Sequence, residues 1–393
     1  MTSAFIAAVR RMQLAGLLVG IVAGLLAAAG WYFDPARFYP AYLVGFLFWI
    51  GMALGAQAVV MIHYLTGGGW GIPIRRILEA AIGTLPVLAL LFLPLLAGLR
   101  ELYPWARPDY VASDSILKRQ LGGYAKIDYL NVDWFLIRSA IYFAIWIVLG
   151  LVLNWLSAGD DPANERWRRR RLALLSGPGM ILWALAVTFA AVDWAMSLEP
   201  HWFSSMYGVL FMAGQGVSGL ALAILIALPL RNAAPWGPSL TVSRVHDVGN
   251  LLLAAVLFWS YVSLMQFLII WSGNLPEETP WYIHRSGGGW QFVAVALAAL
   301  HFLVPFLLLL MRQTKRDARW LLGVAGLLAV MRLVDLYWLV IPAFRPQRLS
   351  IHWLDLVVPL AIGGFALAAF ASRLLVRAPL AVCDDPLLET SHA

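Results

Sequence analysis

Residues 14–33, with the sequence LAGLLVGIVAGLLAAAGWYF, decide the fold class. A run of about 20 apolar residues is the length that an α-helix needs to cross the hydrocarbon core of a bilayer. The hydrophobic part of a signal peptide is shorter, about 7–15 residues. We therefore interpret the run as a retained transmembrane helix, although Arg10 and Arg11 precede it as they would in a signal peptide.

Similar apolar runs recur along the whole chain of 393 residues. Transmembrane barrels instead alternate polar and apolar residues in segments of about 10. The sequence therefore predicts an all-α integral membrane protein that forms a single polytopic domain over residues 1–393. Ten transmembrane helices are expected, at residues 12–33, 41–64, 77–99, 134–156, 173–197, 206–229, 247–271, 289–311, 319–341 and 353–375.

Composition excludes several functions. The chain is 62% hydrophobic and 12% charged, whereas soluble proteins are about 45–50% apolar and about 25% charged. The net charge of +7 is spread over loops between helices, so no nucleic-acid binding is expected. The single cysteine, Cys383, excludes an intrachain disulfide, a cysteine-ligated Fe–S cluster and C-x-x-C-H haem attachment. His63 and His246 fall near one surface and His301 has no histidine opposite it, so we expect no haem and no metal in this chain.

Arginine and lysine residues set the expected orientation. They are concentrated in the loops on the N-terminal side of the membrane, so both termini are predicted to face the cytoplasm. The long polar loop 100–133 then lies on the opposite side, which is the periplasm in a bacterium, and is expected to form a cap. The basic residues on the N-terminal side are Arg10, Arg11, Arg75, Arg76, Arg166, Arg168–Arg171, Arg231, Arg244, Arg312, Lys315, Arg316, Arg319, Arg373 and Arg377.

Polar side chains inside the spans are candidates for function, because a charge near the bilayer centre costs at least about 2.5–3.5 kcal/mol. Gln215 and His301 fall near the middle of their spans. The candidates near the N-terminal side are Gln57, His63, Glu79, His246, Asp247 and Asn250. The candidates near the opposite side are Arg138, Asp193, Gln266, Arg332, Asp335, His352 and Asp355.

Helices six to nine carry these residues at graded depths, which predicts a path for protons. The path is expected to include His246, Asp247, Gln215, His301, Arg332 and Asp335, together with Asp193. Arg332 and Asp335 can pair because they are three residues apart on one helical face, and the ordinary pKa of histidine near 6.5 suits His301 to a relay. Structural alternatives stay open: a purely structural ion pair, a histidine that only packs, and a contact of Asp247 with the helix dipole.

His63 and Glu79 form a secondary group near the N-terminal side of the membrane. Glu79 follows Arg75 and Arg76 by four and three residues, which places the three side chains on one helical face. An ion pair at the membrane interface is the structural interpretation of this spacing.

Four stretches resemble one family of membrane subunits. The most specific are VDWAMSLEPHWFS at 192–204 and QFLIIWSGNLPEETPWY at 266–282, and the others lie within 48–80 and 352–359. The chain is similar to the F subunit of bacterial alternative complex III, a quinol:cytochrome c oxidoreductase. That subunit is one of two membrane subunits of the polysulfide-reductase or NrfD-like type, and the resemblance covers nearly the whole chain.

The resemblance implies two four-helix bundles, helices 2–5 and helices 6–9, with helices 1 and 10 outside them. The first bundle would begin within residues 34–170 and extend to about 197, and the second would cover residues 206–341. The resemblance also implies a location in the bacterial inner (plasma) membrane. The expected partners are the sister C subunit, an Fe–S subunit, multihaem cytochrome c subunits, phospholipids and a terminal oxidase.

The resemblance further implies that quinol is oxidised in the sister subunit, while Fe–S clusters and c-type haems of partner subunits carry the electrons. This chain would hold no redox centre and would provide a proton path coupled to that oxidation. Two alternatives stay open: a purely structural scaffold, and a subunit that itself binds a quinone such as menaquinone. The candidate residues for quinol binding are Asp193, Gln266, His352 and Asp355.

A stand-alone transporter is a further alternative from another functional class. Transporters usually contain broken helices at corresponding positions of two related halves. The prolines at 86, 94, 305 and 359 form no such matched pair, which disfavours this alternative.

Overall fold

The computed structural model describes residues 3–118, 120–121, 124–158 and 164–377, and Cys383 lies outside this part. Ten helical spans are long and apolar enough to cross a membrane, which confirms the predicted all-α, multi-pass fold. The spans are Ser3–Phe33, Pro35–Thr66, Gly69–Ala97, Val132–Ser157, Glu165–Leu198, Tyr207–Leu230, Val242–Gly273, Trp290–Leu310, Ala318–Ala343 and Leu354–Val376.

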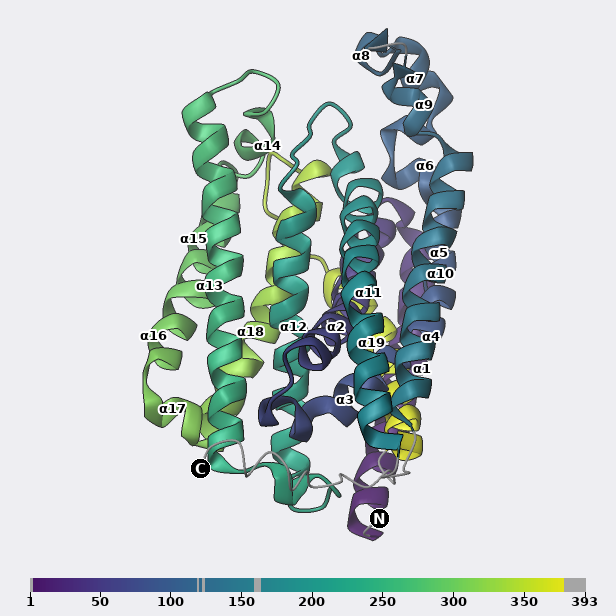
Figure 1. Cartoon of the computed structure of the whole chain (residues 1–393). Helices are drawn as coiled ribbons and strands as arrows, with labels where there is room; N and C mark the ends of the chain where they lie inside the picture. Colours follow the sequence, from purple (N-terminus) through teal and green to yellow (C-terminus); the bar gives the residue numbers. More distant parts are fainter. Residues whose placement is uncertain (1–2, 119, 122–123, 159–163, 378–393) are drawn as a thin grey trace.

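Successive spans alternate in direction, so the molecule has two ends (Figure 1). We call the end at which α1 (Ser3–Phe33) begins the basic face, because it carries Arg75, Arg231 and Arg316. The opposite end carries the segment 99–131 and is called the cap face. Short elements build that segment: α6 (Leu99–Leu102), η2 (Pro104–Ala106), α7 (Pro108–Ser113), α8 (Ser115–Lys118), β1 (Gln120–Leu121), β2 (Tyr124–Ala125) and α9 (Lys126–Tyr129), with β1 and β2 antiparallel.

Several spans are longer than the apolar runs that predicted them, because polar residues continue the helices beyond the bilayer. The helix α11 (Glu165–Trp194) begins in the arginine-rich segment, where Arg169 donates to Glu165 one turn earlier at 2.7 Å. At the start of α2 (Pro35–Thr66), the side chain of Asp34 caps the helix by accepting the backbone N–H of Arg37.

Two spans are interrupted. The third consists of η1 (Gly69–Gly71), α3 (Ile72–Ile82), α4 (Leu85–Leu90) and α5 (Leu93–Ala97), and a proline stands in the first turn of each of the last three helices. Proline suits the first turn of a helix but breaks a helix that precedes it. The eighth span consists of α15 (Trp290–Ala296), the π-helical stretch η6 (Leu297–Leu303) and α16 (Val304–Leu310).

The helix α2 lies at the centre of the packing, with 94% of its most apolar window buried. It crosses α12 (Tyr207–Leu230) where Gly55 faces Gly219. A Cβ on Gly55 would stand 1.8 Å from the carbonyl oxygen of Gln215, so only glycine allows the two backbones to approach this closely.

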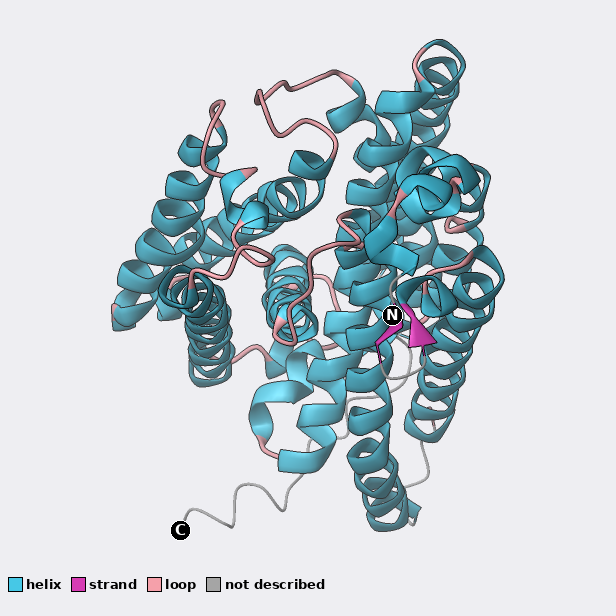
Figure 2. Cartoon of the chain, turned by 90° about the horizontal axis from the view of Figure 1, so that it is seen from above, coloured by secondary structure: helices cyan, strands magenta, loops and turns pink. Residues whose placement is uncertain are grey.

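The spans pack as two groups of four that meet where α2 contacts α12. Figure 2 shows the helices from above. The first ring contains α2, the span of α3 to α5, α10 (Val132–Ser157) and α11. The second ring contains α12, α13 (Val242–Gly273), the span of α15 to α16, and α18 (Ala318–Val340).

The first and last spans lie outside the two rings. The helix α1 packs mainly against α19 (Leu354–Arg377), and α19 in turn packs against α2. Gly16 and Gly20 of α1 meet the backbone of Gly364, where an added Cβ would stand 2.2 Å from the nitrogen of Gly20. The remaining short elements are η4 (Met196–Leu198), η5 (Gly237–Ser239), α14 (Pro280–Ile283), α17 (Arg312–Arg316) and η7 (Ile341–Ala343).

Candidate functional site

A buried ion pair lies inside the second ring. Arg332 and Asp335 are each 2% exposed and are joined through Nη1 and Oδ2 on one face of α18, as their spacing predicted. Trp259 of α13 donates its indole N–H to the same Oδ2 at 3.2 Å. The buried ring of His301 stacks on Trp259, with ring centroids 4.0 Å apart. We call these four side chains the central cluster.

Two backbone features make room for the central cluster. A Cβ on Gly214 of α12 would stand 2.2 Å from Cζ of Arg332, so the absence of a side chain there admits the guanidinium group. His301 lies in η6, whose π-helical winding the sequence analysis did not predict. Pro305, directly after this stretch, cannot donate a hydrogen bond to the carbonyl of His301 four residues earlier. Such π-helical turns are rare in proteins, and those that occur are often found at functional sites.

His301 and Gln215 carry buried polar atoms without partners. Among the described residues, neither ring nitrogen of His301 nor Oε1 of Gln215 has a hydrogen bond. Gln215 faces α2, because its Cγ lies 3.6 Å from the position of a Cβ on Gly51. The structure therefore places Gln215 between the two rings rather than in the central cluster. Buried polar atoms of this kind commonly bind internal water.

A second polar cluster lies at the basic-face end of the second ring. Lys315 is 7% exposed and donates Nζ to Oδ1 of Asn250 at 2.7 Å. The amide nitrogen of Asn250 lies 3.3 Å from Nδ1 of His246, which lies 3.8 Å from the half-exposed carboxylate of Asp247. We call His246, Asn250 and Lys315 the basic-face cluster.

An apolar layer separates these two clusters. Along α13 the helical rise from Asn250 to Trp259 is about 13 Å. Leu252 and Val256, which lie between them on the same helix, are fully buried. The graded series predicted from the sequence is therefore two clusters with an apolar layer between them.

Glu199, which follows η4, joins the end of the first ring to the segment between α13 and α15 of the second ring, through Arg285 and His284. Its carboxylate accepts Nη1 of Arg285 at 2.8 Å and lies 2.9 Å from Nδ1 of His284. The buried Arg285 also donates to the carbonyls of Trp338 and Leu339 at the end of α18, at 3.2 and 2.8 Å. Burial lowers the pKa of Arg285, and the negative charge of Glu199 opposes that shift.

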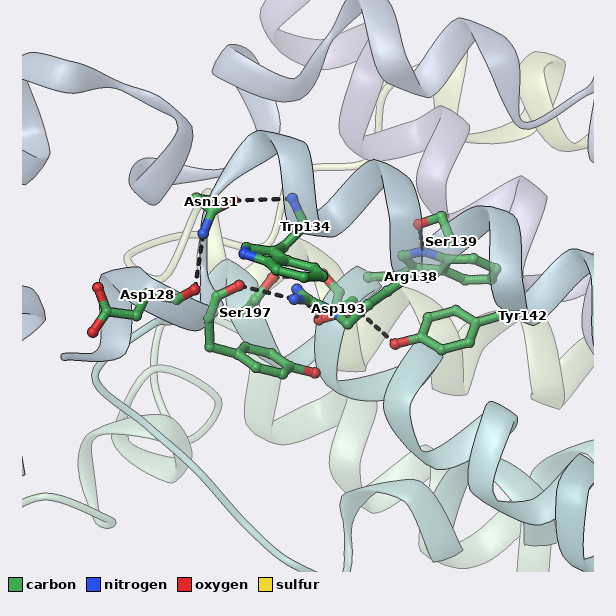
Figure 3. Close-up of polar contacts among 10 residues, drawn as sticks. Asp128, Asn131, Trp134, Arg138, Ser139, Tyr142, Asp193 and Ser197 are labelled. Atoms are coloured by element: carbon green, nitrogen blue, oxygen red, sulfur yellow. Dashed lines mark hydrogen bonds and ion pairs between the residues drawn. The ribbon is translucent and has the colours of Figure 1, made fainter. Parts of the chain in front are cut away.

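Asp193 belongs to a separate network in the first ring (Figure 3). Its Oδ2 accepts Nε of Arg138 at 2.8 Å and the hydroxyl of Tyr142 at 2.7 Å, while its Oδ1 accepts Nη2 of Arg138 at 3.0 Å. Arg138 also donates to the backbone carbonyl of Tyr129. Its Cζ lies 3.8 Å from the centre of the aromatic ring of Tyr129. Asp193 is thus bound through both carboxylate oxygens, on a different ring from the central cluster.

Glu79 lies at the basic-face end of the first ring, and its predicted ion pair with Arg76 is confirmed by a distance of 2.9 Å. Its other carboxylate oxygen accepts the hydroxyls of Tyr64, at 2.9 Å, and Ser157. The buried charge is therefore well compensated. His63 lies one residue before Tyr64, and its Nδ1 is a buried atom without a partner among the described residues.

The remaining candidates lie near the cap face and form two separate contacts. Oδ2 of Asp355 accepts the backbone N–H of His352 at 2.7 Å and the hydroxyl of Tyr337 at 3.1 Å. Oδ1 of Asp355 is buried and has no partner among the described residues. Gln266 of α13 is 3% exposed and accepts the hydroxyl of Ser204 at 3.5 Å.

Sequence reasoning missed several participants in these networks, among them Trp259, Arg285, Lys315 and Tyr142. Nothing in the sequence distinguishes Trp259 from the other tryptophans or Arg285 from the other arginines between spans, and Lys315 enters the sequence analysis only as a charge that sets topology. Tyr142 carried a usable signal, since it lies one helical turn after Arg138 and so shares its face.

Among the described residues, no group of three or more His, Cys, Asp or Glu side chains is arranged to hold a metal ion. No family model matches this chain, and no curated protein matches it. The functional assignment therefore rests on side-chain geometry and on the sequence motifs.

Proposed function

We propose that this chain is an integral subunit of a quinol-oxidising respiratory complex of the alternative complex III type. In this proposal it lies in a bacterial inner membrane with both termini in the cytoplasm, so the basic face is cytoplasmic and the cap face is periplasmic. Quinol is oxidised in a sister subunit, and Fe–S clusters and c-type haems of partner subunits carry the electrons. The second ring of this chain conducts protons that are coupled to the oxidation.

The central cluster is the observation that supports a proton path. Arg332 and Asp335 are charged groups inside a ring of membrane-spanning helices, where isolated charges are costly. Asp335 accepts the indole N–H of Trp259, which stacks on a histidine whose two ring nitrogens have no partner among the described residues. A neutral imidazole can accept a proton on one nitrogen and release one from the other. A structural ion pair needs no such neighbour.

The path has two halves. On the cytoplasmic side, protons enter past the basic-face cluster and reach His301 through internal water that crosses the apolar layer at Leu252 and Val256. On the periplasmic side, they pass from Asp335 toward Glu199. Arg332 and Trp259 both donate to Oδ2 of Asp335, and protonation of this carboxylate would remove the negative charge with which Arg332 is paired. Loosening of the Arg332–Asp335 pair is thus the step that quinol oxidation in the sister subunit must control.

Quinol binding by this chain is a second candidate function, supported by Asp355. Its buried Oδ1 has no partner among the described residues, and it would have to become accessible near the cap face to accept a quinol hydroxyl. Asp193 is a poor acceptor for the same role, because Arg138 and Tyr142 already occupy its carboxylate. Transport by this chain alone is less well supported, since the two interruptions fall at the second span of the first ring and at the third span of the second ring.

The test compares matched double variants in the complex purified with its haem- and Fe–S-containing partners. Arg332→Gln/Asp335→Asn removes both charges of the central pair, so no unpaired buried charge remains. The matched control Arg138→Gln/Asp193→Asn removes the pair of the first ring. After reconstitution in proteoliposomes, we expect the first variant to oxidise quinol while losing most coupled proton movement, and the control to keep a wild-type proton-to-electron ratio.

Two outcomes would contradict the proposal. A wild-type ratio in Arg332→Gln/Asp335→Asn would leave this chain as a structural scaffold. Purification of the chain from native membranes as a stable monomer, without haem or Fe–S partners, would remove it from the respiratory complex.

A further inference from the structure

A hollow of about 510 Å³ lies on the basic face, where the end of α12 meets the turn between α17 and α18. Arg231, Arg316 and Arg319 line it together with Gln313 and Asp317. It is an open, shallow depression rather than an enclosed pocket.

The guanidinium groups around the hollow are free. Arg231, Arg316 and Arg319 are exposed, and none of their side chains has a hydrogen-bond or ion-pair partner in the described parts of the chain. Asp317 uses its Oδ1 to accept the backbone N–H of Arg319 and so caps α18. Three arginines and one aspartate leave the hollow with an excess of positive charge. The positive end of the α18 helix dipole adds to it.

A second hollow, on the cap face, provides a contrast. Its volume is about 750 Å³, and Arg37, Arg345 and Arg348 line it. Arg37 is already paired with Asp34 at 3.2 Å, and Arg345 donates to the hydroxyl and the carbonyl of Ser350. Two of its three guanidinium groups are therefore engaged, whereas all three on the basic face are available.

Apolar side chains beside the basic-face hollow place it at the level of lipid headgroups. Trp320 is 59% exposed and directly follows Arg319, while Leu310 and Met311, before α17, are 53% and 49% exposed. Tryptophan is enriched at membrane–water interfaces, and exposed aliphatic residues next to free arginines fit acyl chains below a charged headgroup.

We propose that this hollow binds the phosphate group of an anionic phospholipid, such as phosphatidylglycerol or cardiolipin. Arginine forms paired, charge-assisted hydrogen bonds with phosphate oxygens, which gives such a site geometry as well as charge. The site uses no residue of the proposed proton path, so the lipid proposal can be tested independently of the proposed function.

The test measures lipid retention by native mass spectrometry of the full protein with its partners. The protein is titrated with phosphatidylglycerol or with zwitterionic phosphatidylcholine. We expect Arg231→Gln/Arg316→Gln/Arg319→Gln to weaken phosphatidylglycerol binding by roughly tenfold or more, since each basic residue near the surface contributes to attraction of anionic lipid. Arg316→Gln alone should give a smaller loss in the same direction.

The matched control is Arg166→Gln/Arg168→Gln/Arg170→Gln, which removes the same charge from the basic face outside the hollow. It should retain phosphatidylglycerol as the wild type does. Equal losses in the two triple variants would overturn the proposal in favour of diffuse attraction by the whole face. Displacement of the lipid by millimolar inorganic phosphate would overturn it in favour of a site for free phosphate.

Discussion

Each ring holds an arginine–aspartate pair whose carboxylate is buried, and the two pairs differ in how completely that carboxylate is bound. In the first ring, Asp193 is bound through both oxygens, by Arg138 and Tyr142. In the second ring, the hydrogen bonds that Asp335 accepts from described residues both reach Oδ2, from Arg332 and Trp259.

The groups around the two pairs also differ in how fully their hydrogen-bonding atoms are used. Arg138 is tied to the carbonyl of Tyr129, next to the first turn of α10, so its pair joins that helix to the cap segment. The pair in the second ring instead adjoins His301, whose two ring nitrogens have no described partner. Burial of a charged pair inside a membrane protein is thus weak support for a proton path. Unused hydrogen-bonding capacity beside the pair is the more informative feature.

The largest expected effect follows from Asp193→Asn. The change leaves the guanidinium of Arg138 without its counter-charge. Removing one partner of a fully buried pair costs about 3–5 kcal/mol, and the partial exposure of Arg138 reduces that cost. We expect a marked loss of thermal stability in detergent and a lower yield of assembled complex. Arg138→Gln/Asp193→Asn should recover part of that loss. A stable Asp193→Asn protein with impaired proton transfer would break the comparison, because it would place Asp193 on the path.

A medium effect is expected from Gly214→Ala. The new methyl group would stand 2.2 Å from Cζ of Arg332 and must displace the guanidinium from Asp335. Overpacking of this kind costs about 1–3 kcal/mol, and coupled proton movement should fall while quinol oxidation persists. The matched control is Gly216→Ala on the same helix, where an added Cβ meets nothing within 4 Å. Equal proton-to-electron ratios in the two variants would show that the position of Arg332 is unimportant.

The smallest effect on stability is expected from Trp259→Phe, which keeps an aromatic ring against His301 but removes the hydrogen bond to Asp335. Loss of one such bond costs about 0.5–1.5 kcal/mol. His301→Phe keeps the stack and removes the relay nitrogens, so it should reduce coupled proton movement more than Trp259→Phe does. The reverse order in proteoliposome measurements would make His301 a packing residue and the indole N–H the functional group.

The transmembrane architecture was predictable because length and apolarity alone select spans that cross a bilayer. The predicted spans coincide with the observed ones apart from their ends, and the pairs Arg76–Glu79 and Arg332–Asp335 follow from helical spacing. Local spacing fixes which residues share a helical face, so contacts within one helix are accessible from the sequence.

Contacts between helices were less accessible, because they depend on the direction of each side chain. Gly214 and Gln215 are adjacent, yet one faces Arg332 and the other faces α2. Lys315 is a loop residue by its sequence, but Gly249 leaves space for its stem and allows it to be buried. Nothing in the hydropathy pattern encodes these directions.

The packing of α1 against α19 has a consequence for how the chain is assembled in the membrane. During synthesis α1 enters the bilayer long before α19, its principal packing partner, is made. Until then α1 is in contact with lipid. The helix α1 is suited to lipid contact on all sides, because residues 14–33 carry no charge and only 28% of its most apolar window is buried in the folded protein. Gly16 and Gly20 then meet the backbone of Gly364 in α19, which also packs against α2, so insertion of α19 connects α1 to the centre of the packing.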